Sequence, residues 1–188
     1  MKILDLGCGK RKVPGAIGVD IDPCSSADII FDLNRTPYPF QDNVFDRVYA
    51  RHILEHLEDI VAVMKEIHRI SKPGAHLLIL TPHFSSYSSF TDISHKHHFA
   101  SGSFDIFDPS LCGEKKPDYP TFRILEKRLF FDLIFKKIRV GRFQGIPIFK
   151  ILGWEALANL FLPTYERFFS FAFPSGGTDL MIKMEVIK

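Results

Sequence analysis

The first twenty residues constrain the fold of this chain more than any other stretch. Residues 3–9 have the sequence ILDLGCG, which predicts a buried parallel strand that ends in a tight turn. Glycine at such a turn permits a positive φ and lets a ligand approach the backbone, because no Cβ is in the way. Residues 17–20 predict a second short strand that ends in the carboxylate of Asp20. In a doubly wound sheet, strand carboxyl ends line the ligand crevice, where an acid can bind ribose hydroxyl groups. A nucleoside site is therefore predicted; the alternative is a strand-turn-strand whose glycines serve the turn alone.

Two motifs in this stretch resemble those of a known family. Asp5-Leu6-Gly7-Cys8-Gly9 resembles the first motif of class I S-adenosylmethionine-dependent methyltransferases, and GVDID at residues 18–22 resembles the end of their second strand. The resemblance implies S-adenosylmethionine as cofactor, with its methionine part against the glycine turn and its ribose hydroxyl groups on Asp20. It implies these cofactor-site residues, with Arg51 contributing its backbone: Asp5, Gly7, Cys8, Gly9, Asp20, Ile21, Asp32, Leu33 and Arg51.

The chain departs from this family in two respects. The family usually has a third glycine two residues after the second, where this chain has Arg11. The family also has a helix between its first two strands, but residues 10–16 are too few for a stable helix and include a proline and a glycine. The cofactor would lose a helix N-terminus and gain Lys10, Arg11 and Lys12. These cations can pair with its carboxylate, or they can simply be solvated.

Downstream, the pattern predicts three more strands and one helix. Residues 28–31 predict a third strand that ends at Asp32, which the resemblance places beside the adenine amino group and which can instead cap the next turn. Residues 45–50 and 75–80 predict the fourth and fifth strands. Between these two strands, apolar residues at helical spacing from Leu57 to Ile70 predict an amphipathic helix. The resemblance extends to PFQDNVFD at residues 39–46, LEH at residues 54–56 and EIHRISKPG at residues 66–74.

Histidines follow the predicted fourth and fifth strands. Methyl transfer needs mainly alignment of donor and acceptor, because the sulfonium is already a strong electrophile. An oxygen or nitrogen acceptor can also need a base, and a neutral histidine suits that task. His52, His56 and His83 are the candidate bases, since each follows a strand end at the crevice. For His56, a structural role at the helix start is the alternative.

A second group of histidines lies in the stretch TDISHKHHF at residues 91–99. We predict that His95, His97 and His98 belong to a loop that faces the substrate. A metal site that includes His83 and Asp92 is the alternative, because short histidine-rich tracts can bind metal. We predict no metal, because His95 and His97 would share a face only in a strand and adjacent histidines point apart.

The second half of the chain has weaker patterns. Residues 101–120 predict a loop with room for one turn of helix, and residues 122–145 are expected to be mostly extended. Residues 148–173 are apolar and aromatic, with helical spacing broken at Pro163. Packing against the sheet is the default for this segment, and a surface helix that touches a membrane or a lipid-linked substrate is the alternative. Residues 179–187 alternate as in a strand, which is expected to be antiparallel at the far side of the sheet.

Composition narrows the class of protein. A net charge of +2 over 188 residues gives no argument for a nucleic-acid partner. The three cysteines lack the spacing of a disulfide framework or a zinc site, which favours a reducing compartment. We expect no signal peptide, and no run reaches the roughly 18 apolar residues of a membrane span. We expect a cytoplasmic location. Residues 148–173 can add peripheral contact with a membrane.

Together these patterns predict an α/β fold with a doubly wound, mostly parallel sheet of the Rossmann-like methyltransferase type. The last strand is expected to be antiparallel and the first crossover helix to be missing. We expect one domain over residues 1–188, with the cofactor half at 1–82 and the substrate side at 83–188. The resemblance implies a methyltransferase that acts on a small-molecule or lipid- or glycan-linked acceptor. The alternatives are a non-catalytic nucleoside-binding protein of the same fold and a metal-dependent enzyme using the histidines.

Overall fold

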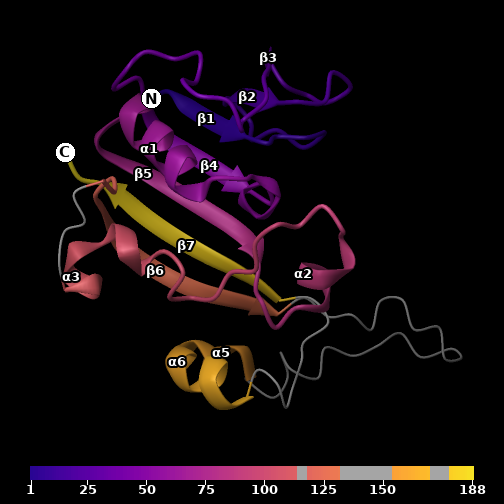
Figure 1. Cartoon of the computed structure of the whole chain (residues 1–188), viewed down its shortest axis with the longest axis vertical. Coiled ribbons are helices and arrows are strands. Elements are labelled where there is room, and N and C mark those ends of the chain that lie inside the picture. The colour runs from indigo at the N-terminus through magenta and orange to yellow at the C-terminus, as the bar shows by residue number, and fades with distance from the viewer. Residues whose placement is uncertain (114–117, 132–153, 170–177) are drawn as a thin grey trace, which may run out of the picture.

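A mixed β-sheet forms the centre of the computed structural model, which describes residues 1–113, 118–131, 154–169 and 178–188 (Figure 1). Within these residues the strand order is β3-β2-β1-β4-β5-β7-β6. The strands are β1 (Ile3–Leu6), β2 (Ile17–Asp20), β3 (Ile29–Ile30), β4 (Phe45–Arg51), β5 (Ser71–Pro82), β6 (Phe122–Phe131) and β7 (Thr178–Val186). The first five strands are parallel to one another, and β7 is antiparallel to both β5 and β6. The predicted fold class is confirmed, including the reversed last strand.

The β1–β2 connection has no helix, as the sequence predicts, and consists of turns over residues 7–16. Gly7 has φ +62° and Gly9 has φ +51°, so both use the left-handed conformation that glycine permits. The amides of Gly7 and Cys8 donate to the carbonyl oxygen of Val19, at 2.8 and 3.2 Å. These bonds continue the pairing of β1 with β2 past the strand end. The glycine turn is therefore held against the carboxyl end of β2.

The first long helix is α1 (Ile60–Ile70), which follows the single 3₁₀ turn η1 (Leu54–His56). It begins later than the apolar spacing predicts, because Asp59 is extended and caps the helix by accepting from the amide of Ala62 at 2.9 Å. Val63, Met64 and Ile67 are buried on the face that packs toward the sheet. β5 starts directly at Ser71, four residues earlier than predicted, across a register shift against β4.

The other helical elements of the described residues are short. They are α2 (Tyr87–Thr91), η2 (Asp105–Phe107), α3 (Pro109–Cys112), α5 (Trp154–Leu160), α6 (Leu162–Thr164) and the π-helical turn η4 (Tyr165–Phe169). α5 lies beside β6 (Figure 1), where the Asn159 amide bonds both backbone groups of Leu129 at 2.7 and 2.9 Å. This contact protects the outer edge of the sheet. The predicted extended residues 132–145, and residues 148–153 and 170–173 of the apolar segment, lie outside the described residues.

The described part of the apolar segment packs on the sheet and also carries apolar side chains on its surface. Ala158, Leu162 and Tyr165 are buried, whereas Leu157, Leu160 and Phe161 are at least half exposed. The face that carries Ala158, Leu162 and Tyr165 therefore packs in the core, as the default expectation predicts. None of the helices in the described residues has the length and apolar character needed to cross a membrane.

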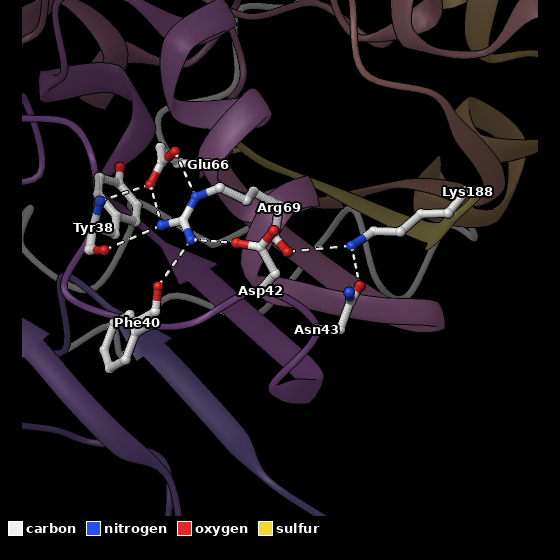
Figure 2. Close-up of polar contacts among 7 residues, drawn as sticks. All are labelled: Tyr38, Phe40, Asp42, Asn43, Glu66, Arg69 and Lys188. Atoms are coloured by element: carbon white, nitrogen blue, oxygen red, sulfur yellow. Dashed lines mark hydrogen bonds and ion pairs between the residues drawn. The ribbon is translucent and has the colours of Figure 1, made fainter.

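A polar network fastens the proline-rich loop before β4 onto α1 (Figure 2). The guanidinium of Arg69 donates to Glu66 at 2.7 and 2.9 Å, to Asp42 at 2.8 Å, and to the carbonyl oxygens of Phe40 and Tyr38 at 2.8 and 3.1 Å. The amide of Tyr38 donates to Glu66 at 2.6 Å. Hydrogen bonds from Arg69 lower the pKa of the Glu66 carboxyl, although burial opposes them. The motif at residues 66–74 thus has a structural role, which the sequence did not indicate.

We expect Glu66→Gln to lower the free energy of unfolding by about 2 kcal/mol at pH 7, the scale of hydrogen bonds to a buried charged group. Because the folded-state pKa of Glu66 lies below its unfolded value, this contribution is full above the unfolded pKa and disappears as pH falls through the folded one. Denaturant unfolding at pH 7 and below pH 4 measures the difference. Glu58→Gln is the control, since that side chain is 71% exposed, and it should stay within about 0.5 kcal/mol. Equal losses for Glu66→Gln at both pH values would contradict the assignment.

Candidate active site

An open cavity of about 490 Å³ lies at the carboxyl ends of β1, β4 and β5. We call it the strand-end cavity, and its lining residues are Gly7, Cys8, Gly9, Lys10, Arg11, Arg51, His52 and Leu80. Four of the residues predicted for the cofactor line it, together with one predicted base and two of the three turn cations. The structure thus brings the glycine turn and the end of β4 together around one hollow, as expected for a doubly wound sheet.

The two glycines of the turn have different structural requirements. A Cβ on Gly7 would lie 2.5–2.7 Å from three side-chain atoms of Ile53, so the neighbouring side chain already fills that space. A Cβ on Gly9 would meet no atom within 4 Å. Gly9 therefore leaves its backbone bare toward open space, whereas Gly7 is required for close packing inside the protein.

Asp20 at the end of β2 fixes the position of Gly9. Its Oδ2 accepts from the amide of Gly9 at 2.8 Å, and its Oδ1 accepts from the amide of Asp22 at 2.9 Å. Each carboxylate oxygen has a second lone pair, so the group can still accept hydrogen bonds from a ligand. Asp20 is half-buried beside the exposed side chain of Ile21.

An ion pair between Asp5 and Arg51 fixes the ends of β1 and β4 beside the cavity. Asp5 is fully buried and accepts from Arg51 Nη2 at 2.8 Å and from the amide of Val13 at 2.7 Å. The same Nη2 donates to the carbonyl oxygen of Arg11 at 2.7 Å. Arg51 was predicted to contribute its backbone, but its side chain holds both the strand and the basic turn. The sequence signal for this pair is an acid inside an apolar strand, because a buried carboxylate needs a cationic partner.

Cys8 is buried at the wall of the strand-end cavity. Burial raises the pKa of its thiol, and the nearby carboxylates of Asp20 and Asp5 raise it further. Cys8 therefore remains a neutral thiol at neutral pH and serves packing rather than nucleophilic chemistry.

Five residues predicted for the cofactor lie outside the lining of the strand-end cavity, namely Asp5, Asp20 and Ile21, described above, and Asp32 and Leu33. Asp32 Oδ1 accepts from the amide of Asn34 at 3.0 Å, and its carboxylate lies 3.6 Å from the guanidinium of Arg35. Asp32 therefore caps the turn that follows β3, which was the alternative role for this residue. Leu33 is buried in the core, and its carbonyl oxygen accepts from the hydroxyl of Tyr38 at 3.0 Å.

His52 is the one predicted base that lines the strand-end cavity. Its φ of +52° is unusual for a residue with a side chain, and its amide donates to the carbonyl oxygen of Leu80 at 2.7 Å. Its ring lies 3.6 Å from the carboxylates of Glu55 and Asp179. The Glu55 carboxylate raises the pKa of His52, against the effect of burial.

His83 is fully buried, and neighbouring side chains occupy both of its ring nitrogens. Nδ1 lies 2.8 Å from Ser85 Oγ, and Nε2 lies 2.9 Å from Glu166 Oε1. Ser101 donates to Glu166 from its amide and its hydroxyl, at 2.6 and 2.7 Å. Burial opposes ionisation of Glu166, but these bonds hold its pKa below the ordinary value. The network joins the end of β5 to η4, and His83 does not line the strand-end cavity.

The remaining predicted histidines do not line this cavity: His56 belongs to η1, and His95, His97 and His98 belong to the loop that follows α2. The His56 and His95 rings meet at 4.7 Å between centroids. His97 Nε2 lies 3.3 Å from the carbonyl oxygen of Glu58, and His98 stacks on Phe90 with centroids 4.2 Å apart. The structure therefore brings His56 and His95 together, which their separation in sequence did not indicate.

Comparison with known proteins gives a consistent result. Residues 4–79 match the family model described as a methyltransferase domain. The uncharacterized protein YafE of Escherichia coli (strain K12) is 33% identical over 76 residues, which cover 35% of this chain and 37% of YafE. An uncharacterized methyltransferase of Schizosaccharomyces pombe is 46% identical over 39 residues, which cover 21% of this chain and 14% of that protein. The matches thus span less than two fifths of either relative.

Solved structures share the fold over nearly the whole chain. A S-adenosylmethionine-dependent methyltransferase from Archaeoglobus fulgidus aligns with a TM-score of 0.60 at 16% identity, covering 98% of this chain and 85% of that one. A putative methyltransferase from Bacillus halodurans aligns with a TM-score of 0.61 at 15% identity, covering 100% of this chain and 93% of that one. At these identities the likeness concerns the fold.

Proposed function

We propose that this chain transfers a methyl group from S-adenosylmethionine, because residues 4–79 match a methyltransferase domain. The acceptor is a small molecule or the head of a lipid- or glycan-linked compound, with an oxygen or nitrogen atom as the methylated group. The cofactor supplies a methyl group on a sulfonium, so the protein must mainly align donor and acceptor.

One observation carries the proposal: the bare backbone of Gly9, held by the Asp20 carboxylate at the edge of an open strand-end cavity. An acid at the end of the second strand is placed for ribose hydroxyl groups, and a glycine without a neighbour allows close approach of a ligand. Lys10 and Arg11 line the same cavity and fit the carboxylate of the methionine part. The exposed apolar side chain of Ile21, next to Asp20, fits the face of an adenine ring.

His52 is the base in this proposal. It lines the strand-end cavity, whereas His83 is buried with both ring nitrogens occupied and His56 is bonded to Ser94. A neutral His52 takes the proton from the acceptor oxygen or nitrogen as the methyl group arrives, and the neighbouring carboxylates of Glu55 and Asp179 then stabilise the imidazolium.

Calorimetry with S-adenosylmethionine and with its demethylated product tests donor binding directly. Turnover is tested by incubating the protein with labelled donor and small-molecule and lipid extracts, followed by mass spectrometry of the methylated product. Binding of both ligands with label transfer supports the proposal. Binding without transfer to any fraction supports the non-catalytic nucleoside-binding alternative, and absence of binding refutes both.

Asp20→Ala is expected to weaken S-adenosylmethionine binding about 10–100-fold, because it removes charge-assisted hydrogen bonds of about 1.5–3 kcal/mol and frees the Gly9 amide. Asp20→Asn keeps an oxygen for the Gly9 amide, so it should retain more affinity than the alanine variant. Asp22→Asn, at an exposed position in the same turn, is the control. Calorimetric affinities for the four proteins decide the matter, and an unchanged affinity in Asp20→Ala would remove the basis of the proposed donor site.

A further inference from the structure

A second cluster of ligand-type side chains lies beside the strand-end cavity and consists of Glu55, His56 and His95. One ligand atom from each of the three lies within 4.8 Å of the ligand atoms of the other two. Glu55 and His56 belong to η1, and His95 belongs to the loop that follows α2. The backbone holds these segments together, because the amides of Lys96 and His97 donate to the carbonyl oxygen of Glu55 at 2.7 and 3.2 Å.

Hydrogen bonds fix the tautomer of His56. Ser94 Oγ donates to Asp92 Oδ1 at 2.6 Å, so its remaining capacity toward His56 is that of an acceptor. His56 Nδ1 lies 2.9 Å from Ser94 Oγ and therefore carries the proton. The lone pair of the neutral ring is then on Nε2. A relay from a carboxylate through a hydroxyl to the far ring nitrogen is the kind of support that orients metal-binding histidines.

His95 is fixed in the same tautomer. Its Nδ1 lies 3.0 Å from the carbonyl oxygen of Ser89, which can only accept, so Nδ1 is the donor. The lone pair of this ring is therefore also on Nε2. That nitrogen is 4.0 Å from Asp92 Oδ2, beyond hydrogen-bond distance. Both histidines thus bind protein oxygen atoms through Nδ1, which leaves the lone pair of Nε2 to a ligand.

Glu55 supplies an unpartnered oxygen to the cluster. Its residue is 1% exposed, and its Oε2 accepts from Thr81 Oγ1 at 3.1 Å. Its Oε1 is buried without a hydrogen-bond partner, and Nδ1 of His52 lies 3.6 Å from it. A buried carboxylate oxygen left without a hydrogen bond is costly, and coordination to a cation would relieve that cost.

We propose that Glu55, His56 and His95 bind one divalent transition-metal ion of the zinc class. Two imidazole nitrogens and one carboxylate oxygen are the donors such an ion prefers, and calcium or magnesium would require more oxygen ligands. Bonds of about 2.1 Å place ligand atoms roughly 3.4 Å apart in a tetrahedral site. The ligand atoms of the three side chains lie within 4.8 Å of one another, so they need to approach by up to roughly 1.4 Å. The ion fastens the loop at residues 92–98 to the end of β4. This site shares Glu55 with the proposed methyl transfer, in which the same carboxylate supports His52. Three protein ligands leave a coordination position for water.

The test uses the full chain, without a purification tag, after removal of metals with a chelator. Co²⁺ is added and followed by its visible absorption, and Zn²⁺ affinity is measured by competition with a chromophoric chelator. We expect one tightly bound equivalent and a Co²⁺ spectrum of low coordination number. His56→Ala, His95→Ala and Glu55→Gln should each weaken Zn²⁺ binding by about 100-fold or more, at or above the upper end of the loss caused by an outer-shell partner.

Two controls make the result decisive. His97→Ala changes a histidine in the same loop that is outside the cluster, and its affinity should equal that of the unchanged protein. Glu55→Gln keeps the shape of the side chain, and circular dichroism of each variant confirms that it is folded. Absence of an equivalent of bound ion, or equal affinity in the ligand variants and in His97→Ala, overturns the proposal. Donor calorimetry on the metal-free protein separates this outcome from a failure of the proposed methyl transfer.

Discussion

Arg51→Ala is expected to lower the free energy of unfolding by about 3 kcal/mol, near the lower end of the cost of breaking a buried ion pair. Its partner Asp5 is fully buried in β1 and would lose its cation, keeping only the amide of Val13 as a donor. The carbonyl oxygen of Arg11 would lose the same donor, so the basic turn beside Gly9 would also lose its anchor. We therefore expect weaker S-adenosylmethionine binding together with the loss of stability.

Denaturant unfolding of the unchanged protein and three variants tests this expectation. Arg47→Ala removes an exposed arginine from the same strand and should cost no more than about 0.5 kcal/mol. In the Arg51→Ala background, Asp5→Asn should recover part of the stability, because a neutral amide is cheaper to bury than an unpaired carboxylate. A loss for Arg51→Ala as small as that for Arg47→Ala would show that Asp5 does not depend on this guanidinium.

The two turn glycines are expected to respond differently to alanine. Gly7→Ala should destabilise the fold by about 3 kcal/mol, because it combines a left-handed backbone, at about 1–2 kcal/mol, with overpacking, at about 1–3 kcal/mol. The overpacking arises because the new Cβ would lie 2.5–2.7 Å from atoms of Ile53. Gly9→Ala carries the backbone cost alone, at about 1–2 kcal/mol, because its Cβ would meet open space.

Donor binding should rank the two variants the other way. The Cβ of Gly9→Ala would project into the strand-end cavity, where the donor approaches the bare backbone, so its affinity should fall at least about 10-fold, or 1.4 kcal/mol. Gly7→Ala should keep most of its donor affinity at temperatures where it remains folded. Thermal unfolding and donor calorimetry on both variants measure the two rankings. If Gly9→Ala binds the donor as the unchanged protein does, the cofactor does not use this backbone.

Local patterns predicted most of the sheet and the glycine turn, because strand and helix periodicity are properties of neighbouring residues. The alternation at residues 179–187 predicted the reversed strand β7, and the proline and glycine of residues 10–16 predicted the missing helix. Element ends were less accurate. The start of α1 depends on the cap formed by Asp59, and β5 begins early because the irregular pairing with β4 tolerates Lys72-Pro73-Gly74.

Side-chain partnerships were the part that local patterns could not supply. The sequence alone placed Asp5, the glycine turn and Asp20 at successive strand ends, because the order of apolar runs and turns is written along the chain. Only the tertiary structure decided that Arg51 holds Asp5, that His83 binds Glu166, and that His56 meets His95. Each of these contacts joins residues from 39 to 83 positions apart, and such contacts depend on how strands and loops are brought together. Tertiary packing therefore decided that His52 lines the cavity, whereas His83 and His56 bind other side chains.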